Sequence, residues 1–566
     1  MYKFSCYGKK LQYLSTFFWQ STCFVINPFW IQVFYFVFLS ITGFWVLKFL
    51  KPKTEFRPRN IDLFFTSVSA TTVSSMSTVE MEVFSNAQLI VMTILMFIGG
   101  EIFTSMVGLH LKRSKIITWN TEEKGTSVDQ IQLTIEPVPN YKAPWFETQN
   151  DVSSPYCNAI LHYNSIKFLS FVVLGYFLVI QLLGVASVLV YLALFSSAKD
   201  VLRNKGIKAL TFSVFTIVST FASCGFVPTN ENMIVFSKNS GLLWILIPQV
   251  LLGNTLFPSC FRFLIWVLGK KIKKAEAKYL LKNTTKVGYL HLLPSLHSSF
   301  LVATVLGFIL TGFVLFCFLE WNSEGLGGLN TYQKVVGILF ETVNARHSGE
   351  TIVDLSTIAP AILVFFVVMM YLPPYTSFLP VKGDEQSTLD CEGAKRRRKW
   401  IAKSLVFSQL SYLVISIILI CITERKSIKE DSINFSVLNI VIEVVSAHGN
   451  VGFTTGYSCE RQLRPQANCT NKWYGFSGKW SDEGKIILIL VMFSGRLKKF
   501  NMNGGKAWKL LKSTPKACLP LIVYSRKNTM ENHEVTLFQV YLKSLFLKQI
   551  LSIVMQDKIF SHLSRV

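Results

Sequence analysis

Four stretches of the chain gather small and hydroxyl-bearing residues within an otherwise apolar sequence. They read Ser69-Ala-Thr-Thr-Val-Ser-Ser-Met, Ser219-Thr-Phe-Ala-Ser-Cys-Gly-Phe, Thr342-Val-Asn-Ala-Arg-His-Ser-Gly-Glu and Ser446-Ala-His-Gly-Asn-Val-Gly-Phe. Near the end of each stand Ser75, Gly225, Gly349 and Gly452. Rings of backbone carbonyls can replace the water shell of a dehydrated cation, and Gly tolerates the positive φ that inward-facing carbonyls can require. These residue types therefore point to cation coordination.

Each stretch follows a mildly apolar segment of about ten residues, too short to span a bilayer. A longer apolar run lies on either side, so the pattern of helix, loop and helix occurs four times. We expect pore units A to D at residues 28–110, 161–270, 299–380 and 401–508. The remaining segments are expected to be a cytoplasmic N-terminus, three cytoplasmic loops and an atypical C-terminal tail, at 1–27, 111–160, 271–298, 381–400 and 509–566.

The composition favours an integral membrane protein. Hydrophobic residues make up 51% and charged residues 16% of 566 residues, whereas soluble domains carry about 25% charged residues. The alternative, buried helices of a large soluble enzyme, fits poorly with so many long apolar runs. The net charge of +24 can indicate nucleic-acid binding, but the basic clusters lie between apolar runs, so we expect a lipid bilayer and no nucleic acid.

Non-helical backbone survives at membrane depth only where it lines water or is buried in protein. Four such loops at equivalent places predict a fold of all-α type, with eight transmembrane helices and four re-entrant pore helices around one pseudo-fourfold pore. The alternative is four ordinary external loops, and their equivalent placement argues against it.

Short basic loops remain cytoplasmic during insertion. The clusters at 270–286 and 395–399 therefore place the inter-unit loops inside and the pore loops outside, in a multi-pass plasma-membrane protein. Asn434 and Asn468 begin sequons on the outer side and are candidate glycosylation sites. Cys459 and Cys469 share one polar loop and could pair there, while the cysteine spacing suggests neither a zinc nor a redox site.

At the four loops the sequence resembles the plant HKT family within the Trk/Ktr/HKT transporters. Further similar stretches are Cys224-Gly-Phe-Val-Pro-Thr-Asn-Glu-Asn-Met, Arg346-His-Ser-Gly-Glu-Thr, Tyr371-Leu-Pro-Pro-Tyr and Gly449-Asn-Val-Gly-Phe-Thr-Thr-Gly-Tyr-Ser. The resemblance implies a selectivity filter at Ser75, Gly225, Gly349 and Gly452, here termed the filter positions. Ser at the first position marks the family members that mainly carry Na⁺, and bacterial relatives imply a possible homodimer.

The resemblance also assigns residues beside the filter and below it. The filter-flanking residues are Val73, Ser74, Ser223, Cys224, His347, Ser348, Asn450 and Val451. Arg496 occupies the place of a basic residue near the pore and is expected to be an electrostatic barrier; the alternative is an Arg that extends to the cytoplasmic interface. Ser223, Ala345 and His448 depart from the residues usual in the family.

A physical argument independent of the resemblance also favours Na⁺ coordination at Ser75. Its Cβ disfavours positive φ by roughly 1 kcal/mol, so its carbonyl could turn away while its hydroxyl coordinates a smaller cation. Acidic residues near the loops are expected either to concentrate cations or to bond to loop amides or Arg346; they are Glu80, Glu82, Glu231, Glu350 and Asp354.

We therefore predict a passive, Na⁺-selective transporter without a cofactor, whose transported ion is Na⁺ alone or Na⁺ together with K⁺. A Na⁺/K⁺ symporter or a K⁺-permeable transporter of the same fold is the alternative. An enzyme is not expected, because the eight His are dispersed and form no HExxH motif with a neighbouring carboxylate.

Overall fold

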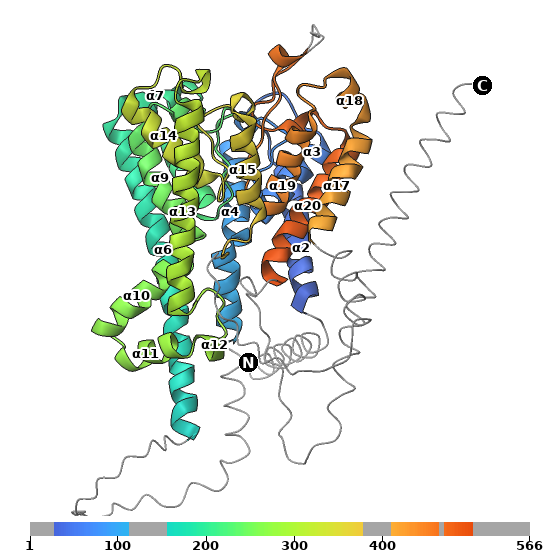
Figure 1. Ribbon diagram of the computed structural model, residues 1–566. Helices are drawn as coiled ribbons and strands as arrows, with labels where there is room; N and C mark the ends of the chain where they lie inside the picture. The colour runs from blue at the N-terminus through green and yellow to red at the C-terminus, as the bar shows by residue number, and fades with distance from the viewer. Residues whose placement is uncertain (1–27, 113–154, 377–408, 463–468, 502–566) are drawn as a thin grey trace, which may run out of the picture. The chain divides into compact units, whose positions relative to one another are not determined.

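The computed structural model describes residues 28–112, 155–376, 409–462 and 469–501 (Figure 1). Within these ranges the regular structure is helical, apart from an isolated β-bridge between Tyr457 and Lys472. All of them belong to one compact unit, Met1–Leu510. The expected N-terminal segment, the loop at 381–400, the tail from 509 and the candidate glycan acceptor Asn468 lie outside the described residues.

The helices follow the expected order of four units, each with an opening helix, a pore helix and a closing helix. Unit A has α2 (Pro28–Phe49), α3 (Asn60–Thr72), and a closing pair, α4 (Asn86–Gly99) and Glu101–Lys112. Unit B has α6 (Pro155–Leu194), α7 (Ser196–Asn204), α8 (Ala209–Phe221), α9 (Ser240–Gly253) and α10 (Phe257–Lys271). Unit C has α13 (Ser295–Glu320), α14 (Thr331–Asn344) and α15 (Pro360–Tyr371). Unit D has α17 (Gln409–Thr423), α18 (Arg425–Glu430), α19 (Val437–Gly449) and α20 (Asp482–Asn501).

Two short helices, α11 (Lys274–Lys282) and α12 (Thr284–Val287), connect units B and C. They lie at the opposite end of the helices from α7 and α18 (Figure 1). The basic cluster that the sequence places in a cytoplasmic loop is therefore at one end, and the segments that carry the pore loops approach from the other.

The four pore helices α3, α8, α14 and α19 have 13, 13, 14 and 13 residues. At 1.5 Å per residue such a helix is roughly 20 Å long, well short of the roughly 30 Å hydrocarbon core. Their side chains are mostly buried, including many Ser and Thr. Two N-termini are capped by side chains: Asn330 accepts from the backbone of Gln333, and Ser436 accepts from that of Asn439. These short helices can therefore hold loops at membrane depth without spanning it.

Three of the described helices are long and apolar enough to cross a membrane: Phe29–Phe49, Ile160–Leu194 and Ser295–Glu320. Two closing helices are bent pairs, with angles of 55° after Gly99 and 82° after Gly253, which raises the number to as many as five. Among the other helices, α15 and α17 are shorter, α17 begins directly after undescribed residues, and α20 carries charged residues.

Glycines bring three closing helices onto the ends of the pore helices of their own units. A Cβ on Gly99 would overlap the carbonyl of Thr71, one on Gly253 would overlap that of Phe221, and one on Gly495 would overlap that of His448. The same close approach recurs in units A, B and D. The filter segments begin directly after these carbonyls. Because the same contact precedes the filter segment in three units, the repetition supports the pseudo-fourfold arrangement.

Candidate functional site

The four filter positions converge on one cavity. Ser75, Gly225, Gly349 and Gly452 all line it, although they lie in four separate units. Further along, the cavity is lined by residues that follow the filter positions, among them Thr229, Asn230, Glu231, Thr351, Asp354, Thr454 and Tyr474. Hydroxyl, amide and carboxylate groups thus surround the approach to the filter positions.

All four filter positions have positive φ. The values are +54° for Ser75, +84° for Gly225, +69° for Gly349 and +102° for Gly452. The idea that the Cβ of Ser75 turns its backbone out of this conformation is therefore wrong. Surrounding packing outweighs a preference of about 1–2 kcal/mol, and what distinguishes Ser75 is its side chain.

In units A, B and D a second residue of positive φ lies two positions before the filter position. These residues are Val73 at +52°, Ser223 at +56° and Asn450 at +51°. Val73 and Asn450 are left-handed C-caps of α3 and α19. A backbone bond closes the helix end in each of the three units, from Ser74 N to Ser69 O (2.9 Å), from Cys224 N to Ser219 O (2.8 Å) and from Val451 N to Ser446 O (3.0 Å). The three segments leave their pore helices with the same local geometry.

The filter segments pack against their neighbours without room for extra atoms. A Cβ on Gly225 would overlap the carbonyl of Ser348, which joins units B and C. One on Gly349 would lie 2.6 Å from the carbonyl carbon of Gly452, which joins units C and D. One on Gly452 would overlap the Cβ of Ser75, which joins units D and A. Glycine is therefore required at three filter positions by contact as well as by φ.

Flanking residues complete the contacts between units. The Nδ2 of Asn450 donates to the Oγ of Ser74 over 2.7 Å, which links units D and A behind the filter. Val73 of unit A and Cys224 of unit B are buried in one apolar cluster, and Val451 of unit D is also buried.

Unit C differs from the other three. Between the end of α14 and Gly349, no residue of this described segment has positive φ. A turn from Ala345 to Ser348 takes the place of the left-handed cap. Ser348 donates to Asn344, and the Nε2 of His347 lies 2.7 Å from the Oγ1 of Thr255. Backbone bonds from His347 N and Gly349 N to Asn344 O also close this turn, over 3.0 Å and 3.1 Å. Side-chain bonds therefore add to the backbone bonds that hold this segment.

The acidic residues beside the loops bind to protein groups. Lys205 donates to Glu82 over 2.5 Å and to Glu231 over 2.7 Å, which ties units A and B together. Burial lowers the pKa of Lys205, but the hydrogen bonds to Glu231 and Glu82 outweigh it, and the net pKa is raised. Glu80 remains exposed and accepts from the Nδ2 of Asn230 over 3.3 Å.

Two further carboxylates belong to unit C. The buried Glu350 accepts from Thr220 of unit B over 2.5 Å, and Asp354 pairs with Arg461 over 3.2 Å. Within the described residues none of these carboxylates pairs with Arg346, contrary to one of the sequence alternatives. Arg346 instead donates to backbone carbonyls.

Arg496 of α20 is fully buried, with 1% of its surface exposed. Its Nη2 donates to the carbonyl of Gly99, where the closing helix of unit A bends, and its guanidinium lies 5.5 Å from the ring centre of Phe36. Glu101 is close enough to interact with it electrostatically. The alternative of a side chain extended toward the interface is therefore excluded by its burial.

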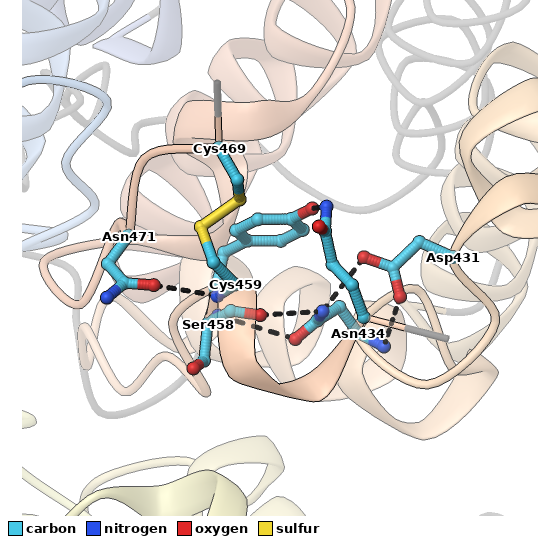
Figure 2. Close-up of a disulfide and its surroundings, with 8 residues drawn as sticks. Asp431, Asn434, Ser458, Cys459, Cys469 and Asn471 are labelled. Atoms are coloured by element: carbon cyan, nitrogen blue, oxygen red, sulfur yellow. Dashed lines mark hydrogen bonds between the residues drawn. A yellow bond between two sulfur atoms is a disulfide. The ribbon is translucent and has the colours of Figure 1, made fainter. Parts of the chain in front are cut away.

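Cys459 and Cys469 form a disulfide (Figure 2), the pairing that the sequence left open. Beside it, Asn434 is fully buried. Its Nδ2 donates to Asp431 over 2.8 Å and to the carbonyl of Ser458 over 3.0 Å (Figure 2). A glycan on this nitrogen would replace one of the two hydrogens that make these bonds and would need space that the buried side chain lacks. The expectation of a glycan at Asn434 therefore conflicts with the folded geometry.

The sequence is similar to known proteins along most of its length. The family model of TrkH, described as a cation transport protein, matches residues 154–378 and 394–502. The sodium transporter HKT1 of Arabidopsis thaliana is 52% identical over 481 residues, which cover 83% of this chain and 92% of that protein. The chain belongs to the HKT family of TrkH-type cation transporters.

One further curated protein and one solved structure are similar to the chain. The cation transporter HKT1;3 of Oryza sativa subsp. japonica is 46% identical over 520 residues, 90% of this chain and 96% of that protein. The crystal structure of the potassium transporter TrkH from Vibrio parahaemolyticus has a TM-score of 0.47 at 13% identity, covering 83% of each chain. This HKT-family chain is a membrane protein that transports cations, and it is not an enzyme.

Sequence reasoning did not identify several residues that contact the four filter segments of this HKT-family chain. The closing-helix glycines Gly253 and Gly495 were detectable as small residues within apolar helices, where they permit close packing. In the sequence, Thr255 stands out only as a polar residue that follows an apolar helix. Its contact with His347 joins two units, and no local pattern reveals it.

Proposed function

We propose that the chain is a passive, Na⁺-selective transporter whose ions pass through the ring formed by the four filter positions. The observation that carries the proposal is the single cavity lined by Ser75, Gly225, Gly349 and Gly452. All four have the positive φ of a filter built from backbone groups. The name of the 52% identical relative, a sodium transporter, supports Na⁺ as the ion.

Selectivity arises from the one filter position that carries a side chain. Ser75 adds a Cβ and a hydroxyl against Gly452, and its residue is 8% exposed at the cavity. The ring is therefore asymmetric, with one hydroxyl among backbone groups. A hydroxyl can bind the smaller Na⁺ directly or through water, whereas a ring suited to dehydrated K⁺ needs four equivalent sets of carbonyls.

Arg496 acts as a barrier on the other side of the filter. It is fully buried beside the bend at Gly99, and a positive charge at membrane depth raises the energy of a passing cation. Movement down the gradient needs no chemical energy, since one charge gains about 2.3 kcal/mol per 100 mV.

The loops face the outside of the plasma membrane, and the N-terminus is cytoplasmic. Disulfides persist in oxidising compartments, and Cys459–Cys469 lies on the segment after the fourth filter position. The basic α11 lies at the opposite end (Figure 1), as cytoplasmic segments do. A homodimer with one pore in each subunit is part of the proposal.

The test is two-electrode voltage clamp in oocytes. External Na⁺ is exchanged for K⁺ while surface protein is measured. A reversal potential that shifts by tens of millivolts with Na⁺ alone supports the proposal. Equal shifts with both ions contradict Na⁺ selectivity, and Na⁺ flux that requires external K⁺ supports the symporter alternative.

A further inference from the structure

The third filter segment is anchored differently from the other three. In units A, B and D, a left-handed residue two positions before the filter position shapes the segment. In unit C, no left-handed residue of the described segment lies between α14 and Gly349. Backbone bonds from His347 N and Gly349 N to Asn344 O close the turn Ala345–Ser348 onto α14, and side chains join it to other helices. The two central side chains of this turn, Arg346 and His347, are both buried.

Arg346 reaches the end of its own closing helix. Its Nη1 donates to the carbonyl of Met369 over 3.2 Å, and its Nη2 donates to that of Pro373 over 2.7 Å. The helix α15 ends at Tyr371, just before Pro373 and Pro374. The carbonyl of Met369 lies in the last turn of α15 and lacks an intrahelical donor, because Pro373 has no N–H. The carbonyl of Pro373 also accepts from the backbone and side chain of Thr376, so of the two acceptors it is the carbonyl of Met369 that needs an outside partner. Arg346 supplies it from the filter segment.

His347 reaches the closing helix of the neighbouring unit. Its Nε2 lies 2.7 Å from the Oγ1 of the fully buried Thr255. Thr255 lies between α9 and α10, where the chain bends by 82°. The same short segment is therefore attached to two interruptions in closing helices, one in unit C and one in unit B.

We propose that Arg346 and His347 are positioning residues that set the ion selectivity of the filter by fixing the unit C segment to these two interruptions. The inference rests on the proposed filter. Ser348 directly follows the pair, and its carbonyl is the group against which Gly225 of unit B packs. A shift of the turn thus moves a contact of the ring itself, in addition to Gly349.

Reversal potentials of Arg346→Gln, Arg346→Lys and Thr255→Val test the proposal. A reversal potential is independent of how many transporters reach the surface, so a folding defect alone does not move it. Arg346→Gln is expected to change the Na⁺/K⁺ permeability ratio by about threefold or more, which corresponds to about 0.7 kcal/mol. Arg346→Lys should fall between it and the wild type, because Lys keeps the charge but lacks the rigid fork of donors. Thr255→Val, which removes one hydroxyl, should change the ratio in the same direction as Arg346→Gln.

Arg262→Lys is the matched control. Arg262 also donates to backbone carbonyls, those of Leu293 and Leu281, but it lies on α10 away from the filter. Its replacement should leave the permeability ratio unchanged. An unchanged ratio in both Arg346→Gln and Thr255→Val would overturn the inference. If Arg346→Gln does not reach the surface, Thr255→Val alone decides in the same way.

Ser75→Gly, measured in parallel, separates the two proposals. If Ser75→Gly changes the permeability ratio and the Arg346 and Thr255 variants do not, the positioning role fails and the filter stands. If none of these variants changes the ratio, the proposed filter fails, and the positioning role fails with it.

Discussion

The Cβ of Ser75 occupies the place that a Cβ on Gly452 would need. The two residues belong to the first and fourth units and meet at the level of the filter. Unit A can therefore carry a side chain in the ring because unit D does not. Two separate features require glycine at position 452, its φ of +102° and its contact with Ser75.

Gly452→Ala is expected to abolish most transport, and Ser75→Gly is expected to restore part of it in the double variant. Removing the Ser75 side chain relieves the overlap, but the alanine keeps the strain of positive φ, roughly 1–2 kcal/mol. Na⁺ current per transporter at the surface measures the recovery. Gly225→Ala is the control, because its Cβ would meet the carbonyl of Ser348 and Ser75→Gly should not rescue it. Equal rescue of both alanine variants would contradict this account.

The sequence predicted the four units and the residues that converge on the cavity, because small polar stretches between apolar runs are a local pattern. It did not predict the positive φ of Ser75, because tertiary packing can outweigh the intrinsic preference of a residue with a Cβ. The turn before Gly349 was also missed. Its anchors, Thr255 and the carbonyl of Pro373, lie far from it in sequence, and only the tertiary fold brings them together.

Tertiary contacts also changed the roles that the sequence predicted for other residues. The sequon at Asn434 has the correct residue types, but the folded chain uses its amide for Asp431 and Ser458. Glu82 and Glu231 were candidates for attracting cations, and the structure pairs them with Lys205. The sequence shows a charged residue or a sequon, but it does not show which group of the folded chain binds that side chain.

Lys205→Met is expected to destabilise the protein by about 1–3 kcal/mol, because it leaves two carboxylates without their partner. Thermal unfolding in detergent measures the loss. Lys199→Met is the control, since Lys199 is exposed on the adjacent α7. Equal melting temperatures for the two variants would show that the pairing with Glu82 and Glu231 contributes nothing.

The raised pKa of Lys205 gives the sign of the pH effect. Its stabilisation is complete below the unfolded pKa of about 10.4 and is lost as the pH rises through the folded value. Lys205 stays protonated between about pH 6 and pH 9. Its titration should therefore leave the difference in unfolding free energy between wild type and Lys205→Met constant over that range. A difference that disappears near neutral pH would contradict this assignment.

Arg496→Gln is expected to raise Na⁺ current per surface transporter severalfold, because it removes a buried positive charge that repels a passing cation. Arg496→Lys should remain close to the wild type, since it keeps the charge. Current and surface labelling in oocytes provide the measurement. A current that is equal in the Gln and Lys variants would show that the charge is not a barrier.

Asn468, and not Asn434, is expected to carry the glycan. The amide of Asn434 is buried and donates two hydrogen bonds, whereas glycans occupy surface asparagines. Digestion with a glycosidase followed by electrophoresis tests this. The mobility shift should persist in Asn434→Gln and disappear in Asn468→Gln, and the reverse pattern would refute the assignment.

The reversal potential of Ser75→Gly tests the central claim, that the ions pass through the filter and that Ser75 sets its preference. Wild type and variant are compared in oocytes as external Na⁺ is replaced by K⁺. Because glycine at 75 makes all four filter positions alike, the account predicts that K⁺ permeability rises toward that of Na⁺. A Na⁺/K⁺ permeability ratio that stays at the wild-type value, in a variant that still carries current, would contradict it.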